Sequence, residues 1–145
     1  MKYSNLFRPS TLAAIYLLAA GFSANEIQHL INPIKYDLEI GKIQIFSALL
    51  IAPPIETFVL SFAINLLNKK SNNVITSIAI GIVFGLVHGF NDAQKILPTT
   101  LIFTGLSLIY LKTKYEYGIK IAIYQNIYIH FLINLFIIIA IKLGT

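Results

Sequence analysis

The sequence predicts an all-α fold, a polytopic integral membrane bundle of about five transmembrane helices. Of the 145 residues, 57% are hydrophobic and 12% are charged, whereas a soluble domain usually has roughly 25% charged residues. The apolar residues gather in runs that approach the ~20 residues needed to cross ~30 Å of hydrocarbon. We therefore expect a single transmembrane domain over residues 1–145.

The first apolar run predicts a span over residues 10–23. This run is short for a full crossing and follows Lys2, Arg8 and Pro9. It therefore also fits the apolar core of a secretory signal that is cleaved near Ser23. Both interpretations stay open, and the polar stretch that follows is expected to form a loop.

The second apolar run predicts a span over residues 43–67 that contains Pro53 and Pro54. Proline has no backbone N–H and clashes with the preceding turn, so two in succession are expected to kink or break the helix. A lipid bilayer permits such a break only where protein or water satisfies the freed carbonyls. Glu56 is then expected in the first turn of a renewed helix.

Three further spans are expected, over residues 74–91, 97–111 and 119–143, with a loop between Lys112 and Gly118. The first of these three is rich in small residues, which let helix backbones approach closely in membranes. It is therefore expected to be a central helix. Its small residues are Ser77, Ala79, Gly81, Gly85 and Gly89.

The charge pattern favours a membrane protein over a nucleic-acid-binding protein. The net charge is +5, but the lysines lie at the ends of apolar runs and not on one face with base-reading side chains. Basic residues gather on cytoplasmic loops, and their distribution predicts a cytoplasmic N-terminus and an external C-terminus. We expect a multi-pass protein of a prokaryotic plasma membrane. The absence of cysteine excludes disulfides and thiolate nucleophiles.

Three ionisable side chains lie deep within predicted spans: Glu56, His88 and His130. Such a group costs about 2.5–3.5 kcal/mol on insertion scales, so it indicates a functional site and needs a partner. Three of them on three spans are best explained if they meet. Asn134 joins them, because residues four apart share one face of a helix.

This set of side chains can hydrolyse an amide bond. A carboxylate can take a proton from water, an imidazole can position that water or bind a metal, and imidazole and amide donors can stabilise an oxyanion. Each residue alone also has a structural interpretation, since polar side chains in membranes often only join helices.

The order and spacing of these residues resemble the CAAX protease and bacteriocin-processing (CPBP, or Abi) family of intramembrane proteases. That family has three motifs: Glu-Glu-x-x-x-Arg, Phe-x-x-x-His, and His-x-x-x-Asn or Asp. The chain has Glu56-Thr57 with Ser61 at the first motif, Phe84 to His88 at the second, and His130 to Asn134 at the third. Thr57 and Ser61 replace the second Glu and the Arg, which indicates that a supporting ion pair is lost as a unit.

The resemblance implies an endopeptidase that cleaves a membrane-embedded or membrane-anchored peptide. It implies that Glu56 and His88 activate water and that His130 and Asn134 form the oxyanion site. A divalent metal such as zinc stays open as a cofactor, since Glu56, His88 and His130 could supply the three protein ligands that catalytic zinc usually has. The expected partners are membrane lipid and the peptide substrate.

Two other functions stay open from the sequence. A non-catalytic member could act in bacteriocin immunity or membrane assembly, and full function of a Glu56→Gln variant would favour that role. Proton- or cation-coupled transport is the other, because intramembrane carboxylates and histidines also relay protons. The lack of an internal repeat counts against transport, and flux through purified protein in liposomes would detect it.

Overall fold

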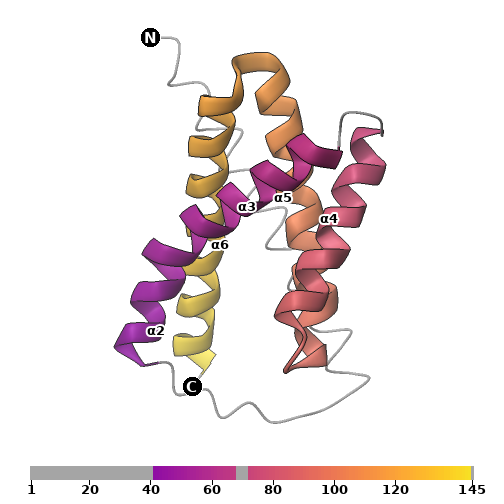
Figure 1. Cartoon of the computed structure of the whole chain (residues 1–145). Helices are drawn as coiled ribbons and strands as arrows, with labels where there is room; N and C mark the ends of the chain where they lie inside the picture. Colours follow the sequence, from indigo (N-terminus) through magenta and orange to yellow (C-terminus); the bar gives the residue numbers. More distant parts are fainter. Residues whose placement is uncertain (1–40, 68–71, 145) are drawn as a thin grey trace.

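The computed structural model describes residues 41–67 and 72–144. The predicted span over residues 10–23 lies outside these described residues. Figure 1 shows that consecutive long helices run in alternating directions. The described elements are α2 (Lys42–Phe46), the π-helical segment η1 (Ser47–Ile51), α3 (Ala52–Leu67), α4 (Asn73–His88), the short 3-10 helix η2 (Ala93–Lys95), α5 (Ile96–Tyr117) and α6 (Ile119–Gly144).

The all-helical membrane bundle predicted from the sequence is confirmed. Three stretches of the described chain, Lys42–Leu67, Ala93–Tyr117 and Ile119–Ala140, are long and apolar enough to cross a membrane, while the apolar helix Asn73–His88 is shorter. The buried core of the bundle joins α3, α4, α5 and α6, with Ile80 and Phe84 contributed by α4. It is formed mainly by Leu60, Ile64, Leu106, Tyr110, Ile129 and Ile133.

Of the kink or break predicted at Pro53 and Pro54, the break is wrong, because residues 42–67 form one continuous helix, but the helix is distorted directly before the two prolines. The helix instead widens to π spacing over Ser47–Ile51, where the backbone N–H of Ala52 donates to the Ser47 carbonyl five residues earlier. This local widening moves carbonyls of the preceding turn and so accommodates the prolines without a break. Glu56 therefore lies inside a continuous helix.

The loop predicted between Lys112 and Gly118 is helical up to Tyr117, so only Gly118 separates α5 from α6. Gly118 has φ +88°, a conformation that glycine adopts at no steric cost. Thr113 donates a hydrogen bond to Gln125 across this tight turn. The two helices consequently form an antiparallel hairpin.

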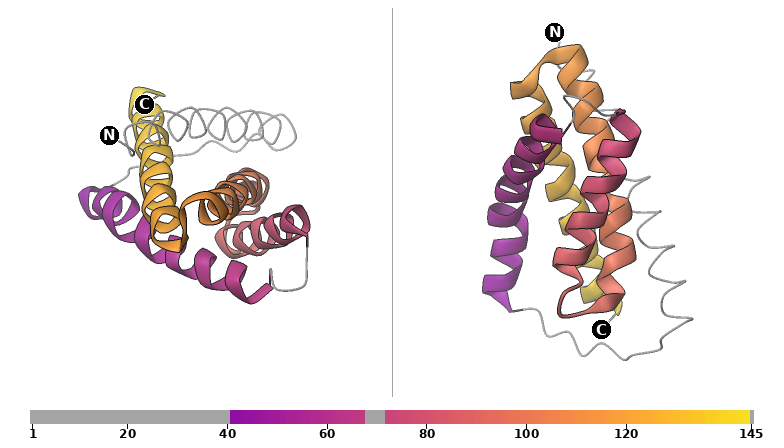
Figure 2. Two further views of the ribbon diagram at one scale, coloured as in Figure 1. Left: turned by 90° about the horizontal axis from the view of Figure 1, so that it is seen from above. Right: turned by 45° about the vertical axis from the view of Figure 1, so that its right-hand side comes forward.

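The small residues of α4 do allow a close approach, and the neighbour is α5. A Cβ atom at Gly85 would overlap the Thr100 hydroxyl and lie 2.7 Å from the Ile96 carbonyl oxygen, and one at Gly81 would lie 2.6 Å from the Thr100 carbonyl oxygen. Figure 2 shows α4 beside α5 at one side of the described helices. Within the described residues, α4 therefore packs mainly against α5, and its predicted central place among five spans stays a prediction.

We expect Gly85→Leu to destabilise the protein by about 2–3 kcal/mol, because the new side chain must push apart two backbones. Ala79→Leu is the matched control, since Ala79 lies on the exposed face of the same helix. Thermal unfolding in detergent measures both. Equal midpoints for the two variants would contradict the close α4–α5 packing.

Candidate active site

Three helices bring the predicted ionisable side chains together. Glu56 comes from α3, His88 from the last residue of α4, and His130 from the middle of α6. The two carboxylate oxygens of Glu56 face different rings, with Oε1 at 3.5 Å from His88 Nε2 and Oε2 at 3.4 Å from His130 Nε2. The carboxylate thus lies between two imidazoles.

The backbone of α4 orients the His88 ring. His88 Nδ1 lies 2.9 Å from the carbonyl oxygen of Phe84, one turn earlier. Since a carbonyl can only accept, Nδ1 donates its proton, and the ring presents Nε2 to Glu56. A lone pair and a carboxylate would repel each other at this distance, so the contact is favourable when a proton lies on one of the two groups.

His130 is the most deeply buried of the three, with 5% of its side chain exposed, compared with 23% for Glu56 and 33% for His88. Its Nδ1 has no hydrogen-bond partner among the described residues. An aromatic ring of α5 packs edge-on against it, because the Phe103 and His130 ring centroids are 5.4 Å apart at an interplanar angle of 89°. Among the described residues, His130 therefore makes its polar contact through Nε2.

Asn134 lies one turn beyond His130 and contacts the backbone instead of the three ionisable side chains. Its Nδ2 donates to the carbonyl oxygen of Ala48 in η1 at 2.7 Å. The structure therefore brings three of the four predicted residues together. The fourth joins α6 to the helix that carries Glu56.

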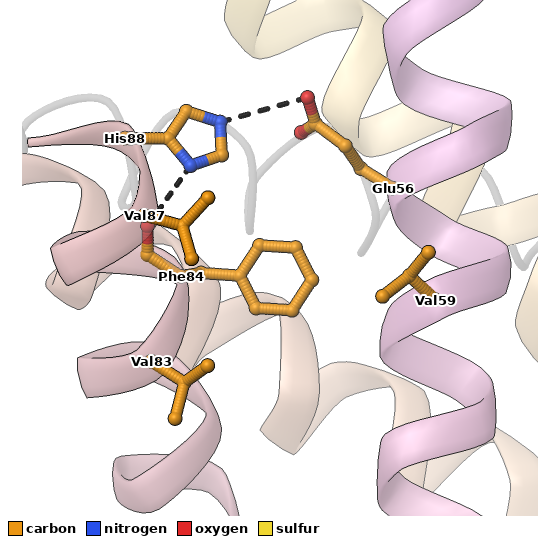
Figure 3. A pocket seen from close by; sticks show the side chains of 6 residues that line it. All are labelled: Glu56, Val59, Val83, Phe84, Val87 and His88. Atoms are coloured by element: carbon orange, nitrogen blue, oxygen red, sulfur yellow. Dashed lines mark hydrogen bonds and ion pairs between the residues drawn. The ribbon is translucent and has the colours of Figure 1, made fainter. Parts of the chain in front are cut away.

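A cavity of about 390 Å³ opens beside Glu56 and His88. Figure 3 shows these two side chains facing each other across the gap between α3 and α4, with the ring of Phe84 between the helices. Three valines, Val59, Val83 and Val87, complete the wall and are exposed on the apolar surface of the bundle. The polar pair is thus reached through an apolar opening.

The sequence suggested a zinc ion held by Glu56, His88 and His130. Over residues 41–67 and 72–144, no three His, Asp or Glu side chains form a group that could hold a metal ion. The described residues as they lie do not fit this cofactor. A metal cofactor stays a prediction from the sequence.

A neutral hydrogen bond forms at one of the two positions where the chain departs from the first motif. Ser61, which stands where the motif has Arg, is 2.6 Å from the hydroxyl of Tyr110, and both side chains are buried. Thr57, which stands where the motif has the second Glu, is also buried. A buried hydrogen bond without charge therefore joins α3 to α5 at Ser61.

We expect Ser61→Ala and Tyr110→Phe each to lower stability by about 0.6–1.7 kcal/mol, the range measured for side-chain hydrogen bonds in membranes. The double variant should be little worse than either single variant, because both remove the same bond. Thermal unfolding of the four proteins in detergent measures this. Fully additive losses would show that the two hydroxyls act separately.

Two aromatic residues of the site could not be assigned a role from the sequence. Phe103 stacks on Phe84 with centroids 4.1 Å apart and also lies 5.5 Å from the His88 ring. The protein has 10 phenylalanines, and nothing in the pattern distinguishes this one. Phe84 begins the second motif; its ring stacks on Phe103, and its backbone carbonyl accepts from His88.

The fold and these side chains define a helical membrane protein with an ionisable site inside its bundle. The chain belongs to the Rce1-like family, described as type II CAAX prenyl endopeptidase Rce1-like, whose model matches residues 40–136. The match includes all four predicted site residues and confirms the resemblance to CAAX-type intramembrane proteases. Neither the curated proteins nor the solved structures give a significant match.

Proposed function

We propose that this protein is an intramembrane endopeptidase in which Glu56 is the general base. The observation that carries the proposal is the position of the Glu56 carboxylate, 3.5 and 3.4 Å from two imidazole nitrogens of separate helices. Membership of a CAAX prenyl endopeptidase family supports peptide-bond cleavage as the reaction. The expected location is a prokaryotic plasma membrane.

In the proposed reaction, water bound near Glu56 and His88 attacks the peptide carbonyl carbon. Glu56 takes a proton from the water as the C–O bond forms, and the carbonyl oxygen becomes an oxyanion. An N–H of His130 at Nε2 donates to that oxyanion once the carboxylate has been neutralised. Glu56 then passes its proton to the leaving nitrogen as the C–N bond breaks, and the base is restored.

The cavity favours a substrate that approaches from the lipid. Four of its six lining residues are apolar, and the three valines lie on the exposed surface of α3 and α4. An apolar anchor or a hydrophobic helix end can occupy such a wall without losing hydration. The family description supports a prenylated peptide as the first substrate to test.

The test uses purified protein in liposomes and a quenched fluorescent peptide that ends in a farnesylated Cys-aliphatic-aliphatic-X sequence. The same peptide without farnesyl is the matched control for the anchor, and a peptide with a hydrophobic transmembrane end is the second substrate. We expect cleavage of an anchored peptide by the natural protein and none by Glu56→Gln. Equal cleavage by both proteins, or no cleavage of either anchored peptide, would contradict the proposal.

A further inference from the structure

The contact between Asn134 and Ala48 joins the two helices that carry His130 and Glu56. Asn134 lies one turn after His130 on α6, and Ala48 lies about two turns before Glu56 on the continuous helix of residues 42–67. At 2.7 Å, this hydrogen bond is shorter than either contact of Glu56 with a histidine. It is therefore a second point of attachment beside the site.

The sequence of η1 explains why the Ala48 carbonyl is free to accept this bond. In η1 the N–H of Ala52 donates to Ser47, five residues back. With the same spacing, the next carbonyl, that of Ala48, would be served by residue 53, which is a proline without an N–H. Burying a carbonyl without a donor is costly in lipid, and the Asn134 amide supplies the missing donor.

We infer that Asn134 is a positioning residue, which replaces the backbone donor that Pro53 lacks and so fixes Glu56 relative to His130. One contact between two helices still allows them to rotate or slide, whereas two contacts oppose both motions when they are one turn apart on α6 and about two turns apart on the helix of residues 42–67. The pair Asn134–Ala48 and the pair His130–Glu56 are two such contacts on the same two helices. This inference rests on the proposed function for the catalytic role of Glu56.

The inference assigns Asn134 a different role from the oxyanion donor that the family resemblance implies. An oxyanion donor must aim its N–H at the reacting atom, and losing one costs about 10²–10³-fold in kcat. Losing a positioning bond to a backbone carbonyl should cost on the order of tenfold. The two roles therefore differ both in magnitude and in dependence on Pro53.

The test is a double-mutant cycle between Asn134→Leu and Pro53→Ala, with kcat and KM measured separately on the anchored peptide. Alanine at position 53 provides an N–H to the Ala48 carbonyl, so the amide should become dispensable. We expect Asn134→Leu to lower kcat about tenfold in the natural background and less than about twofold in the Pro53→Ala background, with KM unchanged in both. An equal loss in the two backgrounds would overturn the inference.

Pro54→Ala is the matched control for the cycle. An N–H at position 54 would serve Leu49 in π spacing or Leu50 in α spacing, and in neither case Ala48. We therefore expect Pro54→Ala to leave the loss caused by Asn134→Leu unchanged. Equal rescue by Pro53→Ala and Pro54→Ala would show a general effect of removing proline and would overturn the inference.

Thermal unfolding tests this inference independently of catalysis and so distinguishes it from the proposed function. The same variants are unfolded in detergent without substrate, and Pro53→Ala should reduce the drop in midpoint caused by Asn134→Leu. If the natural protein cleaves no peptide but this coupling is found, the proposed function fails and the Asn134–Ala48 attachment stands. If cleavage occurs and neither kcat nor the midpoint shows coupling, the attachment fails alone.

Discussion

Glu56→Gln is expected to lower kcat on the anchored peptide by about 10²–10⁴-fold, the usual contribution of a general base. Glutamine has nearly the shape of glutamate but cannot take a proton from water. The variant should fold as well as the natural protein, because an amide removes a buried charge while keeping groups that can bond to His88 and His130. Initial cleavage rates in liposomes and unfolding midpoints in detergent are the two measurements.

Glu116→Gln is the matched control for this variant. This substitution makes the same chemical change at an exposed residue in the last turn of α5. Glu116 lies at the opposite end of the bundle from His88. We expect its kcat to be unchanged. Retention of full activity by Glu56→Gln would exclude Glu56 as the base and would favour a non-catalytic role for the protein.

His130→Leu is expected to have the second largest effect, a loss of about 10²–10³-fold in kcat, typical of removing an oxyanion donor. Leucine fills a similar apolar space against Phe103 but donates no hydrogen bond. Folding should survive, since within residues 41–67 and 72–144 the polar contact of His130 is that with Glu56, and its Nδ1 has no partner there. Steady-state kinetics on the anchored peptide measure the loss.

His130→Gln provides the control that separates chemistry from packing. The glutamine amide provides an N–H donor at a similar distance from the backbone, so kcat should be higher than in His130→Leu. If the loss came from packing alone, kcat would be as low as in His130→Leu. If the leucine and glutamine variants are equally impaired in kcat and equally destabilised, His130 acts through packing and the oxyanion role fails.

The described helices could be predicted because lipid leaves a backbone few choices. Helical hydrogen bonding satisfies every peptide group within its own segment, so long apolar runs between polar segments imply helices. Predictions were wrong where a polar segment or a proline was judged only from its neighbours in the sequence. Residues 112–117 are polar yet helical, since a helix can extend beyond its apolar part until Gly118 permits the turn.

The sequence predicted a kink or break at Pro53, and the reason why the helix is distorted there but not broken could not be predicted. The local rule is sound, because the proline does remove a donor, but a distant side chain on α6 supplies another. No sequence pattern indicates that the Asn134 side chain will meet the backbone of Ala48, because a backbone carbonyl does not stand out in a sequence as an ionisable side chain does. The hydrogen bond between Ser61 and Tyr110 could not be predicted from the sequence either.

The site itself was largely predictable because its members are conspicuous in apolar segments. Spacing of four residues correctly placed His130 and Asn134 on one face of α6, but it also separates them by about 6 Å along the helix axis. That rise takes Asn134 to Ala48, while His130 reaches Glu56. A shared helix face therefore did not imply a shared partner.

The π-helical segment also determines how length changes would affect this protein. Loss of one codon within Ser47–Ile51 could restore ordinary α spacing while leaving the hydrophobicity of the span almost unchanged. Because each helical residue turns the chain by about 100°, α2 would then point a different side toward α6, and the residue facing Asn134 would change. Such a deletion would leave membrane insertion unchanged and still remove the Asn134–Ala48 contact beside the site.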